Sequence, residues 1–205
     1  MSLDDAYNKA VESMAHIDLR AAALASGAGY RESRFIIPLF DRTYTVCFPT
    51  CETAQIGSDS CVPMVVKLLL MHYLIHADGA AVSGDWISYR QLPGARLFEQ
   101  RFVNLVTHPL LDILDNDTDL FREAAEAMGG QALETDGDAA FRFDALPRLP
   151  MACIFNKGEG DIPSSASVLF DDSASHYLPT EDLTILGGIM SSLMKNIVKT
   201  DCRKM

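Results

Sequence analysis

The chain has 205 residues, of which 48% are hydrophobic and 22% charged, a balance typical of one globular domain spanning residues 1–205. Its 28 acidic and 17 basic side chains give a formal net charge of -11, which disfavours nucleic acid and anionic membrane surfaces as partners. The longest apolar run, 62–75, is too short to cross a bilayer, and the first residues lack the pattern of a signal peptide. We therefore expect a cytoplasmic protein without membrane contact.

The first predicted element is a helix over residues 1–26. Asp4 or Asp5 can cap its start, and Gly27 can end it. Two runs rich in β-branched and aromatic residues follow, 34–40 and 43–48, and they predict a hairpin. Pro38 lacks a backbone N–H, so we expect its strand at a sheet edge.

The strongest helix signal covers Met64 to Ala77, after Pro63. It is apolar on nearly every side, which predicts a helix inside the domain. The stretch from Ala80 to Gly94 reads as an ordered loop with a short strand.

The rest of the chain alternates helical and strand signals. Helical spacing runs from Leu97 to Leu114 with a break or kink at Pro109, and again from Asp117 or Thr118 to Met128. Short strands are expected over 139–143, 151–155 and 167–170, and a last helix from Thr180 to Lys199, with residues 199–205 as a frayed tail. Strands that cluster as hairpins favour an α+β fold, with an antiparallel sheet packed against about five helices.

Two stretches carry a family resemblance. Residues 83–94 read SGDWISYRQLPG, and residues 167–183 read SVLFDDSASHYLPTEDL. Together with LMHYL at 70–74 and the Gly137-Asp138 pair, they resemble the domain of unknown function 3786 family of anaerobic prokaryotes.

This resemblance implies no established activity. Some members of the family look like fusions to a four-cysteine iron–sulfur module of the kind found in corrinoid iron–sulfur proteins. The resemblance therefore implies a link to anaerobic redox or corrinoid metabolism. Because the predicted first helix here has no cysteine, we expect any cluster to lie on an iron–sulfur or corrinoid partner protein.

His72 and His76 form the first candidate site. Four residues apart on a helix, they lie about 40° apart on one face, the spacing of zinc-binding histidine pairs. Tyr73 stands where a metalloprotease carries its glutamate base. The alternative is a buried histidine bonded to a carbonyl and a second one at the helix end, favoured by the dipole.

His176 is the best single candidate. It follows a predicted strand in a polar loop that includes Asp171 and Asp172. A carboxylate beside the imidazole could raise its pKa and make it a base, a metal ligand or an axial cofactor ligand. Alternatively, the loop is a capping network for free backbone groups.

Two further groups could bind a ligand. Trp86, Tyr89 and Arg90 could stack on a flat ligand or hold a carboxylate, or Trp86 could anchor the loop to the core. Cys47, Cys51 and Cys61 lack the spacing of a zinc or cluster site and read better as buried free thiols. With Cys153 and Cys202 the chain has five cysteines, an odd number that argues against a disulfide scaffold.

Other motifs are weak or missing. Asp115, Asp117, Asp119 and Glu126 match calcium-loop positions, but Leu120 replaces the required glycine, so helix capping is the better interpretation. The sequence has no glycine-rich phosphate loop and no nucleophile elbow.

Three hypotheses follow. The first is an accessory domain that binds a small ligand or a metallocofactor such as a corrinoid, a haem or a divalent metal. The second is a metal-dependent enzyme centred on His176 and Asp171, with His72 nearby. The third is a purely structural interaction module.

Overall fold

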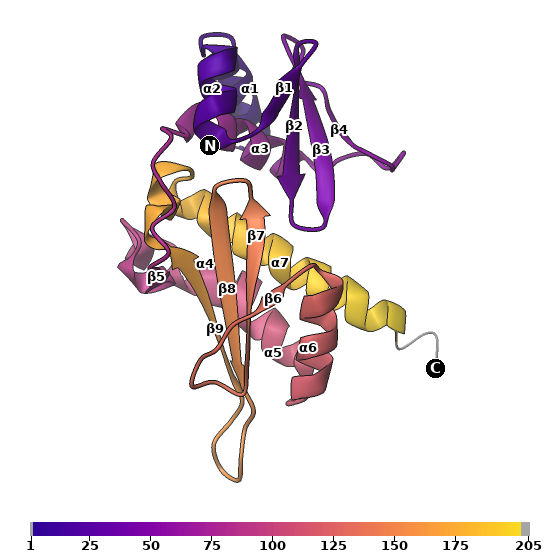
Figure 1. Ribbon diagram of the computed structural model, residues 1–205, viewed down its shortest axis with the longest axis vertical. Helices are drawn as coiled ribbons and strands as arrows, with labels where there is room; N and C mark the ends of the chain where they lie inside the picture. The colour runs from indigo at the N-terminus through magenta and orange to yellow at the C-terminus, as the bar shows by residue number, and fades with distance from the viewer. Residues whose placement is uncertain (1, 202–205) are drawn as a thin grey trace.

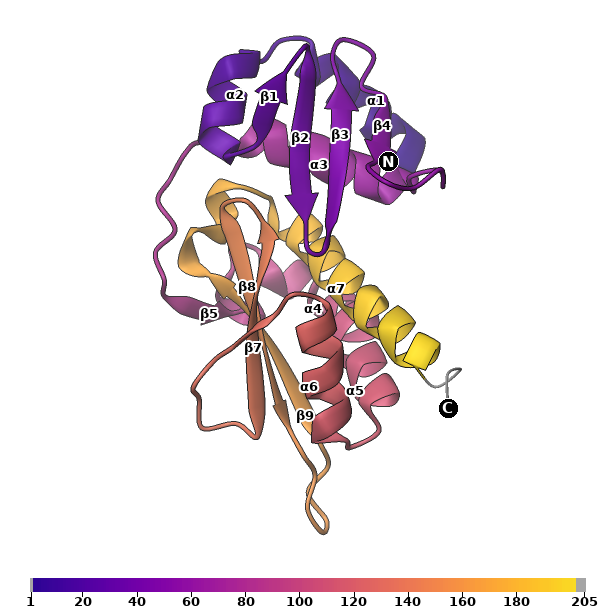
Figure 2. The same ribbon diagram turned by 45° about the vertical axis from the view of Figure 1, so that its right-hand side comes forward.

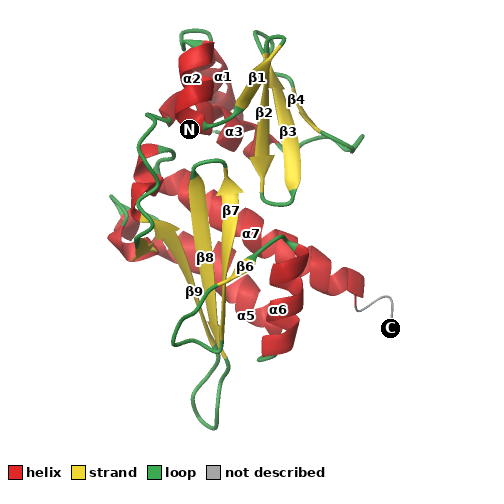
Figure 3. Cartoon of the chain, in the orientation of Figure 1, coloured by secondary structure: helices red, strands yellow, loops and turns green. Residues whose placement is uncertain are grey.

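The computed structural model describes residues 2–201 and shows two antiparallel sheets packed with helices, which confirms the α+β class (Figures 1 and 3). The helices are α1 (Leu3–Met14), α2 (Leu19–Ser26), α3 (Met64–His76), α4 (Glu99–Phe102), α5 (His108–Leu114), α6 (Thr118–Ala127) and α7 (Thr180–Asp201). The strands are β1 (Gly29–Arg31), β2 (Arg34–Leu39), β3 (Arg42–Cys47), β4 (Thr53–Gln55), β5 (Trp86–Ser88), β6 (Gln131–Ala132), β7 (Ala139–Leu146), β8 (Leu149–Asn156) and β9 (Ser165–Asp171).

The predicted first helix is two helices, because the chain turns between Met14 and Asp18. Ser2 and Asp5 form a capping box at the start of α1. The Asp18 carboxylate accepts two backbone N–H bonds at the start of α2, which makes a new helix end where we expected a continuous one. Gly27 ends α2 with a φ of 71°, as predicted.

Sheet A has the order β1-β2-β3-β4, and its centre is the predicted hairpin of β2 and β3. The expectation that Pro38 marks an edge strand is wrong, since β2 lies between β1 and β3. However, β1 pairs with β2 only as far as Ile36, so Pro38 stands beyond the end of its neighbour. A proline is tolerated there because no ladder hydrogen bond on that side needs its missing N–H.

Helix α3 is buried, as its apolar sequence predicts. The side chains that it removes from solvent are Val66, Leu68, Leu69, Leu70, Met71, Tyr73 and Leu74. Tyr73 also ties distant segments together: its hydroxyl donates to the Ser26 carbonyl at 2.6 Å and accepts from the Arg148 N–H at 3.0 Å. Helix α3 thus connects the end of α2 with the turn between β7 and β8.

Sheet B has the order β5-β9-β8-β7-β6, all antiparallel. The predicted strands over 139–143, 151–155 and 167–170 are its three long members, whereas the short strand β6 gave no sequence signal. The predicted helix over 97–114 consists of α4, a π-helical turn Val103–Thr107 and α5. Its hydrogen-bonding pattern changes just before Pro109, which has no N–H to donate.

The acidic stretch after α5 caps a helix. Asp117 accepts the N–H groups of Asp119 and Leu120 at the start of α6, as the capping interpretation predicts. The predicted last helix begins at Thr180 and extends to Asp201. Most of the predicted frayed tail, 202–205, lies outside the described residues.

The molecule has two halves, shown one above the other in Figure 1. The N-terminal half holds α1–α3 and sheet A, and the C-terminal half holds sheet B and α4–α7. A segment without regular structure, 77–85, joins them. The buried apolar side chains of both halves nevertheless form one continuous cluster, so the halves share a core.

Candidate functional site

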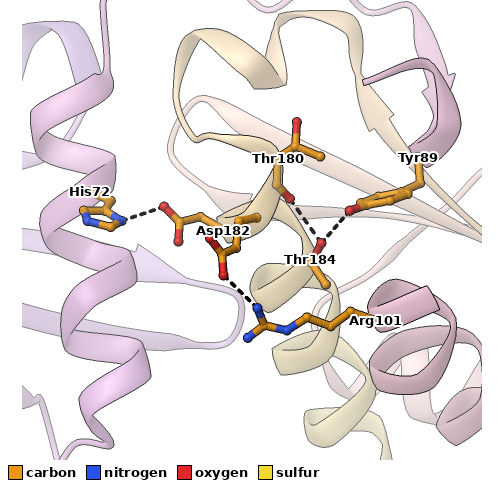
Figure 4. A network of polar contacts seen from close by, with 7 residues as sticks. His72, Tyr89, Arg101, Thr180, Asp182 and Thr184 are labelled. Carbon is orange, nitrogen blue, oxygen red and sulfur yellow. Dashed lines mark hydrogen bonds and ion pairs between the residues drawn. The ribbon is translucent and has the colours of Figure 1, made fainter. Parts of the chain in front are cut away.

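The two family-like stretches lie side by side. Strand β5 pairs with β9, with Trp86 opposite Asp171 and Ser88 opposite Leu169. The hydroxyl of Thr180 at the start of α7 donates to the Pro93 carbonyl at 2.6 Å. Segments 83–94 and 167–183 therefore form one structural unit, next to the end of α3 (Figure 4).

Asp171 holds this unit together. Its side chain is fully buried and accepts hydrogen bonds from the backbone and hydroxyl of Ser83, the N–H of Gly84, and the backbone and hydroxyl of Ser173. Burial alone would raise the pKa of Asp171, but these hydrogen bonds outweigh it and the pKa lies below its usual value. Asp171 fixes the segment that enters β5, and both of its oxygens are engaged in doing so.

His176 is paired with a different carboxylate. Its Nδ1 lies 2.7 Å from Asp78 Oδ2, and both side chains are about half exposed. The hydrogen bond to His176 is the main reason that the pKa of Asp78 lies below its usual value. The structure thus joins His176 to the segment between the halves, and it places Asp171 in a separate set of contacts.

His72 and His76 lie on one face of α3, as the spacing predicts, with ring centroids 5.7 Å apart. His72 Nδ1 is 2.6 Å from Asp182 Oδ2 in the first turn of α7, and both side chains are largely shielded from solvent. Burial and the neighbouring His72 lower the pKa of His76, against the opposite effect of Asp182. The contact between His72 and Asp182 connects the two halves.

The residues 2–201 do not hold a group of three or more His, Cys, Asp or Glu side chains placed to bind a metal ion. Cys51 and Cys153 are buried, Cys47 is half-buried and Cys61 is exposed, and all four are free thiols. Burial raises the pKa of Cys153 to about 12, which keeps it protonated. Cys202 lies outside the described residues.

Trp86, Tyr89 and Arg90 do not share one surface. Tyr89 is buried and stacks on Phe102 with ring centroids 3.9 Å apart. Arg90 is exposed and its Nε lies 2.6 Å from Glu99 Oε1. Trp86 is half-buried in β5. The Tyr89 ring belongs to the core and has no face free for a ligand.

A polar network surrounds the start of α7 (Figure 4). The Tyr89 and Thr184 hydroxyls are 2.6 Å apart, and Thr184 donates to the Thr180 carbonyl at 3.1 Å. Arg101 Nη1 donates to Glu181 Oε1 at 2.7 Å. Glu181 and Asp182, whose negative charge favours the start of a helix, therefore also bind neighbouring helices: Glu181 binds α4 and Asp182 binds α3.

A groove of about 1110 Å³ lies between the halves. Helices α3 and α7 meet where His72 contacts Asp182 and diverge from there, and the turn of β2 and β3 points towards α7 (Figure 2). The groove is lined by the β2–β3 turn (Leu39, Asp41, Arg42, Thr43, Tyr44), the chain from β4 to α3 (Gln55, Ile56, Ser58, Ser60, Cys61, Val62, Pro63, Val65, Val66), Arg101, Leu105 and α7 (Ile185, Gly188, Ile189, Ser192, Leu193, Asn196).

Sequence reasoning missed this groove. None of the histidine, Asp171 or Trp86–Arg90 candidates lines it, and of the four described thiols only Cys61 does. Its walls come from segments of both halves that are far apart in the sequence. The structure does carry a sign of the groove: Ile56 and Leu105, both large and apolar, are 55% and 40% exposed on its walls. This exposure cannot be predicted from the sequence, because it depends on where the fold places the two side chains.

Among the described residues, no helix combines the length and apolarity that a membrane span requires.

Comparisons with known proteins identify the family of this chain. No curated protein and no solved structure matches the chain. A family model described as "Domain of unknown function (DUF3786)" matches residues 18–192, which include both stretches that pack together beside α3. The chain therefore belongs to the DUF3786 family.

Proposed function

We propose that this protein is a ligand-binding accessory domain that holds a small organic molecule in the groove between its halves. The observation that carries the proposal is the groove itself, about 1110 Å³ in volume and lined by both halves. Binding sites for small molecules are commonly concave, mostly apolar with a few placed polar groups, and between structural units. Two other hollows, of about 440 and 510 Å³, are less than half as large.

The groove has the mixed lining of a binding site. Ile185, Ile189 and Leu193 present one apolar face of α7, and Val65 and Val66 lie across from it on α3. Hydroxyl and amide groups are interspersed, from Ser58, Ser60, Ser192 and Asn196. A ligand there would contact both halves and would hold them in one arrangement.

The family resemblance suggests anaerobic corrinoid or iron–sulfur metabolism as the setting, with any cluster on a partner protein. The groove lining does not fit a haem or corrinoid bound through histidine, because His72, His76 and His176 all lie outside it. Cys61 is its one soft donor. We therefore propose an organic ligand for the groove and do not propose a metal there.

The enzyme alternative has less support. It requires His176, Asp171 and His72 to act together, yet each has its own separate partner: Asp78, the groups around Ser83 and Ser173, and Asp182. The binding hypothesis needs no such convergence.

Titration with anilinonaphthalene sulfonate, whose fluorescence rises in apolar surroundings, tests the proposal. We expect saturable binding of one molecule per chain. Ser192 is exposed and lines the groove, so Ser192→Trp fills it without adding bulk to the core. We expect this variant to lose at least tenfold in affinity, equivalent to about 1.4 kcal/mol.

The matched control is Lys195→Trp, an exposed position on the same helix outside the groove. It should bind the dye like the unmodified protein. Unchanged thermal midpoints would show that both variants fold. Equal affinity in Ser192→Trp and Lys195→Trp would place the dye elsewhere and refute the proposal.

A further inference from the structure

The charges on the groove point to the class of its ligand. We propose that the ligand is a small amphiphilic carboxylate, whose acid group is bound by Arg42 and Arg101 and whose apolar body lies along α7. This inference rests on the proposed function and adds the chemistry of the occupant.

The groove does not share the acidic excess of the whole protein. The whole chain has 28 acidic and 17 basic residues. Among the described residues that line the groove, the charged ones are two arginines, Arg42 and Arg101, and one aspartate, Asp41. Asp41 lies beside Arg42, and Glu181 binds Arg101, so these four charges balance. Because the protein as a whole is strongly acidic, this wall repels an anion less than the rest of the surface does.

Both guanidinium groups have donors available for a carboxylate. The Arg42 Nε lies 3.8 Å from Asp41 Oδ1, a distance longer than a hydrogen bond. Arg101 uses Nη1 to bind Glu181, and both of these side chains are about half exposed. Because a guanidinium carries five N–H donors in a planar fork, each arginine can still bind a carboxylate with two hydrogen bonds.

The apolar wall on α7 is elongated along the helix axis. Ile185, Ile189 and Leu193 recur every four residues along α7, and at 1.5 Å per residue they extend over about 12 Å. Leu105 and Ile56 add exposed apolar surface. An elongated hydrocarbon body with a charged end matches this wall better than a compact polar metabolite does.

The test compares two probes with the same body and different charge: dansyl-labelled undecanoic acid and its methyl ester. We expect the acid to bind at least tenfold more tightly than the ester. The double variant Arg42→Gln/Arg101→Gln should reduce the affinity for the acid at least tenfold and leave the affinity for the ester unchanged. Arg96→Gln, an exposed arginine outside the groove, is the charge-matched control and should change neither.

The outcomes separate the two proposals. If acid and ester bind equally and Ser192→Trp weakens both, the groove binds ligands but the carboxylate assignment is wrong. If the acid binds more tightly but the double variant and Arg96→Gln behave alike, the two arginines are not its site and the inference fails. If Ser192→Trp affects neither probe, the proposed function fails with it.

Discussion

At the scale of single residues, Asp171 determines how the chain enters the C-terminal half. A fully buried carboxylate with five donors around it is stable only while it is ionised, because a protonated or amide side chain would direct a donor at other donors. The same residue was a candidate for chemistry from its sequence context, where a buried capping aspartate and a reactive one look alike.

We predict that Asp171→Asn destabilises the fold by roughly 3 kcal/mol at neutral pH, measured by urea unfolding. Asp172→Asn, the exposed neighbour with the same change of charge, should cost less than about 0.5 kcal/mol.

The pH dependence gives an independent check on Asp171. Because its folded pKa lies below the usual value of about 3.9, its contribution is complete above that pH and is lost as the pH falls through the folded pKa. The stability difference between the unmodified protein and Asp171→Asn should therefore shrink below about pH 4. A difference that stays constant down to about pH 3, well below the usual aspartate pKa, would show that the carboxylate charge does not matter.

The buried hydroxyl pair of Tyr89 and Thr184 gives an asymmetric prediction. Thr184 donates its single proton to the Thr180 carbonyl, so Tyr89 must be the donor between the two hydroxyls. Thr184→Val leaves the buried Tyr89 O–H without an acceptor and should cost about 1–3 kcal/mol. Tyr89→Phe removes that donor altogether and should cost less, since Thr184 keeps its bond to the carbonyl. Thermal or urea unfolding of both variants measures the two losses of stability. A larger loss in Tyr89→Phe than in Thr184→Val would contradict the assignment of Tyr89 as the donor.

At the scale of elements, α7 uses adjacent residues to pack against the C-terminal half and to line the groove. Gly187 faces the π-helical turn, where an added Cβ would lie 3.0 Å from Val106 Cγ2. Gly188 faces Leu105, with 3.7 Å to the nearest atom, an ordinary contact, and it lines the groove. Of these two successive glycines, only Gly187 has a close contact that favours the absence of a side chain.

Alanine at these two positions should change the free energy of unfolding by different amounts. Gly188→Ala should stabilise the protein by about 0.5–1 kcal/mol, the usual gain from replacing a helical glycine. Gly187→Ala should lose this gain to crowding against Val106, leaving it at least about 1 kcal/mol less stable than Gly188→Ala. Equal stability of the two variants would contradict the packing described for α7.

The helices, strands and caps that were predicted correctly are those specified by residues close together in the sequence. The apolar run of α3, the β2–β3 hairpin and the caps at Gly27 and Asp117 all follow from neighbouring residues. The break at Asp18 and the position of Pro38 inside sheet A depend on which segments pack together, and the shortest strands have too little sequence to be recognised.

At the scale of the whole molecule, the candidate site was the hardest feature to predict. His72 and His76 were correctly placed on one helix face, but their role depends on Asp182, which is 110 positions later in the chain than His72. The groove needs both halves in place before Arg42 and Arg101, far apart in sequence, border one space. Residue chemistry alone directed attention to histidines, whereas the lining of the groove between the halves, as far as the described residues show, includes none.

The most direct measurement is a crystal structure of the full chain with dansyl-labelled undecanoic acid. We expect electron density for the probe between the β2–β3 turn and α7, with its carboxylate at Arg42 and Arg101 and its chain along Ile185, Ile189 and Leu193. Density in another hollow, such as the one beside Tyr7 and Lys67, with the groove filled only by solvent, would contradict it.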